Sequence, residues 1–214
     1  MSDFIGFGIL AVAAGSAAIG AGRKIVERRR ARRELRERPP LGVGSPEGVV
    51  VRVTGTVQVL DATLTAPLSA RTCVVVRTRV QAGGKLTSRA QRPKEEIAMT
   101  PFVIDRGAQG RVVIEGKHVL LDLPPLRMHR KDIDRGRRER FALAHGLSMR
   151  EVSRALFEET IVEPGMRVSV AGLMMKDPAA EPVSDELGFR DAPPTSQRLA
   201  GNVDHPLVIG EPVD

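Results

Sequence analysis

The pattern of apolar and polar residues changes twice along this 214-residue chain. Residues 4–22 (FIGFGILAVAAGSAAIGAG) contain no charged side chain, and residues 23–38 are dominated by charge. After Gly48 the apolar residues recur with a period of two. A period of two is typical of half-buried strands, whereas a long uncharged run is typical of a helix. The pattern therefore predicts an N-terminal helix followed by a mainly β domain.

Several short segments carry the β prediction. Residues 49–60 (VVVRVTGTVQVL) alternate valine with polar residues, and residues 72–81 (TCVVVRTRVQ) are also β-branched and alternating. The segments FVID and RVVIEG flank the glycine-bearing loop RGAQG, which predicts a hairpin. A short strand is expected at 118–124, and a Glu-Pro-Gly turn at 163–165 joins two more. The expected fold is a small barrel- or sandwich-like β domain.

A short helical insertion interrupts the strands. Residues 134–146 (DRGRRERFALAHG) predict a helix that ends at Gly146. Ser148 and Glu151 have the spacing of a capping box, which predicts that a second helix begins there. We therefore expect helix within roughly 134–156 and strand over most of the remaining body.

The uncharged run at the N-terminus has the length of a membrane span. As a helix rising about 1.5 Å per residue, residues 4–22 would extend roughly 28 Å, close to the thickness of a bilayer core. We predict a transmembrane helix over 1–22. Residues 23–38 then hold nine basic and three acidic side chains, a net charge of +6. By the positive-inside rule we expect this flank and the β domain to lie in the cytoplasm and the N-terminus to lie outside. The membrane we expect is a bacterial inner membrane.

The basic segment is predicted to be a juxtamembrane helix. Its i,i+4 pairs include Arg23/Glu27, Arg30/Glu34, Arg33/Glu37 and Glu34/Arg38. Pro39-Pro40 end it, and residues 39–48 read as a linker before a β domain over 49–210. The residues expected to contact anionic lipid headgroups are Arg23, Lys24, Arg28, Arg29, Arg30, Arg32 and Arg33. A stripe of small residues would allow self-association of the membrane helix: Ala14, Ala18 and Gly22.

Three blocks of the body resemble a known family. APLSARTCVVVRTRV (66–80), PFVIDRGAQGRVVI (101–114) and VEPGMRVSVAG (162–172) are similar, in order and spacing, to the signature blocks of the GIDE domain. This domain, also called BAM for "beside a membrane", occurs in mitochondrial RING-type E3 ubiquitin ligases and in bacterial relatives. The resemblance covers about residues 45–210 and implies a binding or sensing module beside a membrane. The RING that gives those ligases their activity needs several zinc-ligating Cys and His residues, and this chain has one Cys.

Few residues are candidates for chemistry. Cys73, the only cysteine, is expected to be a buried thiol in the barrel interior, and His118, His129, His145 and His205 lack metal-ligand spacing. Asp105 is expected to bond the backbone of a hairpin turn. A cluster in the helical insertion is a possible partner or headgroup patch: His129, Arg130, Lys131, Arg135, Arg137 and Arg138. No catalytic, cofactor or metal residue is assigned.

The function expected from the sequence is a single-pass, membrane-anchored binding, scaffold or sensing module with an unidentified protein partner. Two alternatives stay open. One is a component of a RING-type ubiquitin-transferase-like system, in which another chain supplies the RING. The other is a nucleic-acid binder that uses residues 23–38, although the body has few of the aromatic side chains on which such proteins stack bases.

Overall fold

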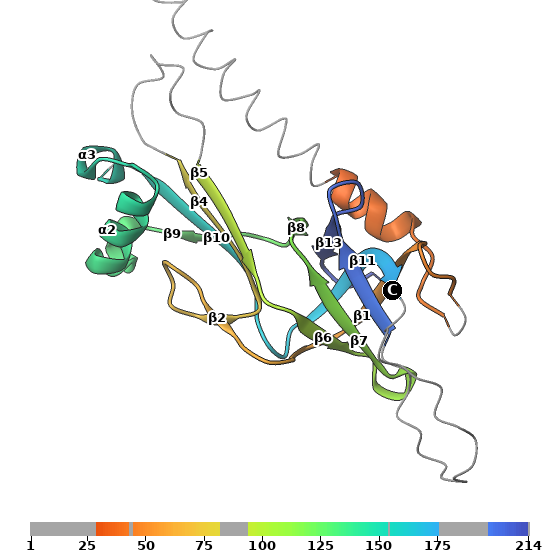
Figure 1. Cartoon of the computed structure of the whole chain (residues 1–214). Coiled ribbons are helices and arrows are strands. Elements are labelled where there is room, and N and C mark those ends of the chain that lie inside the picture. The colour runs from red at the N-terminus through yellow and green to blue at the C-terminus, as the bar shows by residue number, and fades with distance from the viewer. Residues whose placement is uncertain (1–28, 43–44, 82–93, 154, 176–196, 214) are drawn as a thin grey trace, which may run out of the picture.

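A computed structural model describes residues 29–42, 45–81, 94–153, 155–175 and 197–213 (Figure 1). The described residues are mainly strand, as predicted. The strands are β1 (Val50–Val59), β2 (Leu64–Thr65), β3 (Thr72–Cys73), β4 (Val75–Gln81), β5 (Lys94–Met99), β6 (Phe102–Asp105), β7 (Arg111–Gly116), β8 (Val119–Asp122), β9 (Leu126–Met128), β10 (Leu156–Val162), β11 (Arg167–Met175), β12 (Gln197–Gly201) and β13 (Leu207–Gly210). The helical elements are residues 29–37, η1 (Gly107–Gln109), η2 (Arg130–Asp132), α2 (Arg135–Ala144) and α3 (Met149–Val152).

Five strands close a barrel, which decides between the two predicted architectures. The order is β1-β6-β7-β12-β11, and β11 returns to pair with β1. All these pairings are antiparallel except β7 with β12. This connectivity is that of a five-stranded Greek-key barrel of the OB type. β13 pairs with β11 outside the ring and carries β8 at its other edge.

The barrel interior is filled by the inward side chains of alternating strands. Val51, Val53 and Val57 of β1 are at most 2% exposed, as the alternation of residues 49–60 predicts. Gly55 lies where β1 leaves β11 for β6, and a Cβ there would come within 2.3 Å of the Asp105 carbonyl oxygen. Glycine at this position therefore allows β1 to pair with β11 along its first part and with β6 along its last part, which closes the barrel. The other fully buried core side chains include Phe102, Ile104, Val112, Ile114, Val168, Val170 and Leu199.

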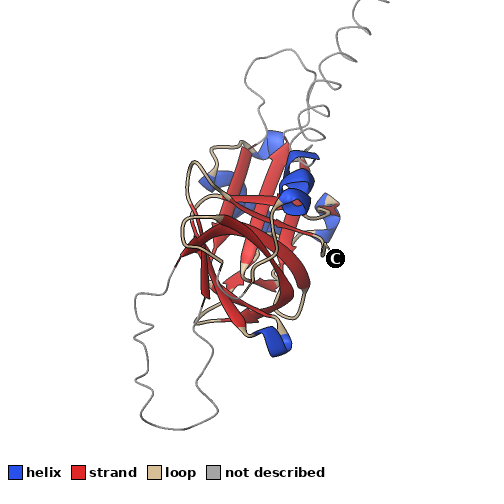
Figure 2. Cartoon of the chain, turned by 90° about the vertical axis from the view of Figure 1, so that its right-hand side faces the viewer, coloured by secondary structure: helices blue, strands red, loops and turns tan. Residues whose placement is uncertain are grey.

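A second sheet of four strands, β5-β4-β10-β9, extends from the barrel toward α2 and α3 (Figures 1 and 2). β5 and β6 are separated by only two residues, so one run of chain passes from this sheet into the barrel. The predicted Glu-Pro-Gly turn joins β10 of the second sheet to β11 of the barrel, with Gly165 at φ 87°. A separate apolar cluster lies between this sheet and the helices: Leu68, Val80, Ile133, Phe141, Ala142, Val152 and Phe157.

The predicted helical insertion is present and its ends follow the predicted signals. The Asp134 carboxylate accepts a hydrogen bond of 3.0 Å from the Arg137 backbone N–H, which caps α2. Gly146, at φ 65°, follows the end of that helix. The hairpin prediction is also confirmed, because β6 and β7 pair around η1. Asp105 accepts a 2.8 Å bond from the Gly107 N–H in that turn, as expected.

The strand predicted over residues 72–81 is interrupted, which changes the surroundings of Cys73. The Val74 backbone N–H donates to the Val162 carbonyl oxygen, outside the regular strand pairing. Cys73, Val74 and Val75 are all fully buried. Val74 and Val75 belong to the barrel core, whereas Cys73 packs in a small cluster with Ala66 and Val76. The prediction of a buried thiol is correct, but its position in the barrel interior is wrong. The alternation fails because the chain here passes from β3, which pairs with β2 in a separate two-stranded sheet, to β4 of the second sheet.

The membrane span predicted over 1–22 lies outside the described residues, and so do Ala14, Ala18 and Gly22. Within the described ranges, no helix combines the length and the apolar character needed to cross a membrane.

Candidate functional site

The helix over residues 29–37 is attached to the barrel by its apolar side. Ala31 and Leu35 are 3% and 1% exposed and pack against Ala171 and Val208. Gly210 of β13 leaves room for Leu35, because a Cβ at that glycine would lie 2.6 Å from Leu35 Cδ1. Residues one turn apart thus form a narrow apolar stripe on an otherwise charged helix.

A long-range ion pair reinforces this contact. Arg32 Nε donates to Asp122 Oδ2 over 2.8 Å, and Glu211 lies 3.6 Å from the same guanidinium. The Asp122 side chain is only 3% exposed, so the pair is shielded on one side. The hydrogen bond and charge of Asp122 raise the pKa of the Arg32 guanidinium. Arg52 adds a 3.0 Å bond to the Leu35 carbonyl oxygen at the other end of the helix.

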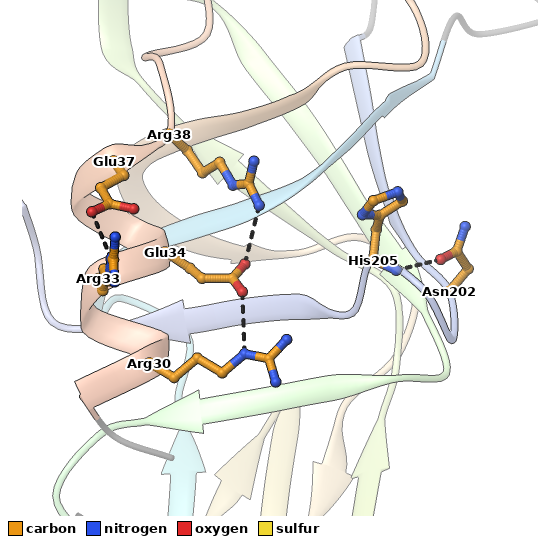
Figure 3. A network of polar contacts seen from close by, with 7 residues as sticks. All are labelled: Arg30, Arg33, Glu34, Glu37, Arg38, Asn202 and His205. Carbon is orange, nitrogen blue, oxygen red and sulfur yellow. Dashed lines mark hydrogen bonds and ion pairs between the residues drawn. The ribbon is translucent and has the colours of Figure 1, made fainter. Parts of the chain in front are cut away.

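The predicted i,i+4 pairs are confirmed wherever the structure describes them. Arg30 and Arg38 both contact Glu34 at 3.4 Å, and Arg33 contacts Glu37 at 2.7 Å (Figure 3). The four predicted lipid-contacting residues that are described, Arg29, Arg30, Arg32 and Arg33, are all exposed. Arg23, Lys24, Arg28 and the Arg23/Glu27 pair lie outside the described residues. Much of the helix charge is thus balanced within the protein.

The chain after this helix also contacts the barrel. Leu41 is 3% exposed and belongs to the barrel core. Its N–H donates to the Arg52 carbonyl oxygen over 2.7 Å, and the Arg52 N–H donates to the Pro39 carbonyl oxygen over 2.8 Å. Residues 39–42, at the start of the predicted linker, therefore hold the helix close to β1.

The predicted patch in the helical insertion is divided between surface and interior. Lys131 and Arg135 are exposed, and Arg135 pairs with Glu139 at 2.7 Å. Arg138 is 9% exposed and donates to the Arg130 carbonyl oxygen over 2.9 Å, so it braces η2 against α2. His129, Arg130 and Arg137 complete the set on the same segment, with Arg130 bonded to the Ser153 carbonyl oxygen. Arg138 is not available to a partner, because its side chain is used inside the protein.

A buried carboxylate escaped the sequence analysis. Glu159 of β10 is 0% exposed and accepts hydrogen bonds from the backbone N–H groups of Leu68 and Ser69, at 2.8 and 3.0 Å. The Thr78 hydroxyl is 3.4 Å away. The only signal in the sequence is a glutamate between Phe157 and Ile161, at an apolar position of an alternating strand. Glu159 holds the loop before β3 against the second sheet.

Cys73 is unsuited to nucleophilic chemistry. Its thiol is fully buried and donates weakly to the Leu64 carbonyl oxygen over 3.7 Å. Burial, with smaller contributions from Glu159 and Glu163, raises the pKa of the Cys73 thiol to about 11. At neutral pH the thiol is protonated and the thiolate needed for transfer chemistry is absent.

Alkylation should report this burial directly. At neutral pH, iodoacetamide is expected to leave Cys73 unmodified in the folded protein and to modify it fully after denaturation. Intact mass measures both states of the same sample. Cys73→Ser should lose some stability. Rapid labelling of the folded chain would contradict the buried, protonated thiol.

In the described residues, histidine and carboxylate side chains are used in other contacts and are not grouped as metal ligands. His145 stacks on Phe141 and lies 3.3 Å from Glu96, which links α2 to β5. His205 bonds through its backbone N–H to Asn202 in the loop before β13 (Figure 3). Over the described parts of the chain, no three His, Cys, Asp or Glu residues are grouped to hold a metal ion.

Comparison with known proteins finds no relative: no family model, curated protein or solved structure matches this chain.

Proposed function

We propose that this protein is a membrane-anchored, GIDE-like binding module whose β domain is held in a fixed orientation beside the bilayer. One observation carries the proposal: the basic helix 29–37 is packed onto the barrel through Leu35 and Arg32. A segment anchored just before residue 29 would then be joined to the domain by a rigid contact instead of a flexible tether. The uncharged stretch 4–22 supplies the expected anchor.

The three blocks that resemble the GIDE domain support a shared fold more than a shared site. They contribute Val74, Phe102, Ile104, Val112 and Val168 to the barrel core. Loop 66–70 of the first block is held by Glu159. Residues of this kind determine packing, so the likeness argues for a binding scaffold, whereas catalysis would need reactive side chains that these blocks do not offer.

The alternative functions receive less support. A nucleic-acid arm needs free basic side chains for phosphate contacts. In helix 29–37, Arg30, Arg32 and Arg33 instead face carboxylates of the protein, and Arg38 does so directly after the helix. A role in a ubiquitin-transferase-like system would need its zinc-binding RING or thiolate from another chain, since Cys73 is buried and protonated.

Extraction of membranes tests the proposal. The full-length chain should stay in the membrane pellet through high-salt and alkaline washes, because an inserted apolar helix is not held by charge. A chain that begins at residue 29 keeps the docked helix and should be released. Immunoblotting of pellet and supernatant measures both. If salt alone releases the full-length chain, it is adsorbed to the surface and the anchor proposal is wrong.

A further inference from the structure

Three apolar side chains stand out by their exposure. Leu143, Leu156 and Val203 are 73%, 67% and 75% exposed, the largest values for big apolar residues in the described parts of the chain. Leu143 lies near the end of α2, Leu156 begins β10, and Val203 is in the loop between β12 and β13. One such side chain needs no explanation, but several at one end of a molecule indicate a contact surface.

Strand directions place all three at the end of the molecule opposite η1. β12 runs parallel to β7, which begins just after η1, so the loop that contains Val203 lies at the far end of the barrel. The run β5–β6 ends at η1, so the start of β5 is also remote from η1. Leu156 pairs with Gln81 on β4, beside that start. In Figure 1, α2 and α3 lie at the end of the second sheet remote from the barrel strands β6 and β7, which flank η1.

The same end carries positive charge. Residues 127–154 hold nine Arg or Lys and four Asp or Glu side chains, a net charge of +5. Lys131 and Arg140 are exposed, and no described carboxylate lies within ion-pair distance of either. Exposed leucines beside unpaired basic residues are typical of surfaces that rest on anionic membranes. The leucines enter the boundary between headgroups and acyl chains, and the basic groups contact phosphates.

We propose that a second membrane-contacting surface, the basic tip formed by Lys131, Arg140, Leu143 and Leu156, rests on an anionic bilayer. The proposal depends on the proposed function, because the anchor expected before helix 29–37 would bring the domain to the bilayer; that helix lies beside β13, on the opposite side of the molecule from α2 and α3 (Figure 1). The domain then touches the membrane at two separated places, through the docked helix and through the tip. Two contacts fix its tilt as well as its distance from the surface.

The absence of tryptophan and tyrosine from the chain permits a direct test. Full-length Leu143→Trp is reconstituted into vesicles of equimolar phosphatidylglycerol and phosphatidylcholine brominated on its acyl chains. Its emission should shift to shorter wavelength and be quenched relative to unbrominated vesicles. Ala108→Trp, exposed in η1 at the opposite end, is the matched control and should show neither change. Adding Lys131→Ala and Arg140→Ala to Leu143→Trp should reduce the quenching.

Flotation of the same vesicles after alkaline washing separates the two proposals. If the chain floats but Leu143→Trp is no more quenched than Ala108→Trp, the tip does not touch the bilayer and only this inference is wrong. Equal quenching of both variants also overturns it, because the contact then has no direction. If quenching stays complete in the Lys131→Ala, Arg140→Ala background, these basic side chains do not hold the tip on the anionic bilayer, and the proposal of a basic tip is wrong. If the chain does not float at all, the anchor fails, and the tip proposal fails with it.

Discussion

Glu159→Ala is expected to lower the free energy of unfolding by about 3 kcal/mol. The Glu159 carboxylate is completely buried and is the acceptor for the backbone N–H groups of Leu68 and Ser69. Alanine leaves the buried Leu68 donor and the half-buried Ser69 donor without this acceptor and also opens a cavity, and each of these effects is destabilising. Chemical denaturation of the full-length chain in detergent micelles measures the loss.

Glu163→Ala is the matched control for this prediction. Glu163 is four residues further along and pairs with Arg71 at 2.8 Å, with 27% of its own side chain and 49% of that of Arg71 exposed. A solvated pair of this kind contributes about 0.5 kcal/mol. Glu159→Gln, which keeps one acceptor oxygen, should fall between the two alanine variants. If Glu159→Ala is no more destabilising than Glu163→Ala, the carboxylate does not hold loop 66–70.

Leu35→Ala is expected to destabilise the protein by about 3 kcal/mol and to release the helix 29–37 from the barrel. Leu35 is 1% exposed, and its contacts with Ala171 and Val208 are the main apolar attachment of that helix. Alanine has a high helix propensity, so the change weakens the attachment without disfavouring the helix itself. Limited trypsin digestion should then cut faster after Arg32 and Arg33, because local opening exposes those bonds.

Arg36→Ala provides the comparison on the same helix. Arg36 is exposed next to Leu35, and no described carboxylate pairs with it, so its replacement should leave stability and the cleavage rate after Arg32 nearly unchanged. Mass spectrometry of early digests identifies the cut sites. Equal cleavage of Leu35→Ala and the parent chain would show that Leu35 does not hold the helix, and the fixed orientation of the domain would lose its basis.

Local features of the fold were predictable because they depend on neighbours in sequence. The alternation of Val51, Val53 and Val57 identified the inner face of β1, and the RGAQG loop identified the β6–β7 hairpin. Asp134 and Gly146 marked the ends of α2. In each case the determining contact lies within a few residues, where period and capping chemistry decide the outcome.

Features that depend on distant partners were not predictable. The break at Val74 arises because the chain passes between two sheets, which no local pattern shows. Arg138 resembles its basic neighbours, yet it is buried because the Arg130 carbonyl oxygen lies within its reach. The Arg32–Asp122 contact joins residues 90 positions apart. Only the tertiary fold determines which of many similar charges meet.

The position of β12 and β13 in the chain has a consequence for folding. β12 fills the gap between β7 and β11, and β13 carries Val208, against which the N-terminal helix packs. During synthesis the barrel therefore remains an open sheet, with two unpaired edges, until residues 197–210 have left the ribosome. A helix made among the first residues must wait for a docking surface made among the last. This high contact order predicts slow folding, with a nascent chain exposed to aggregation until its final strands arrive.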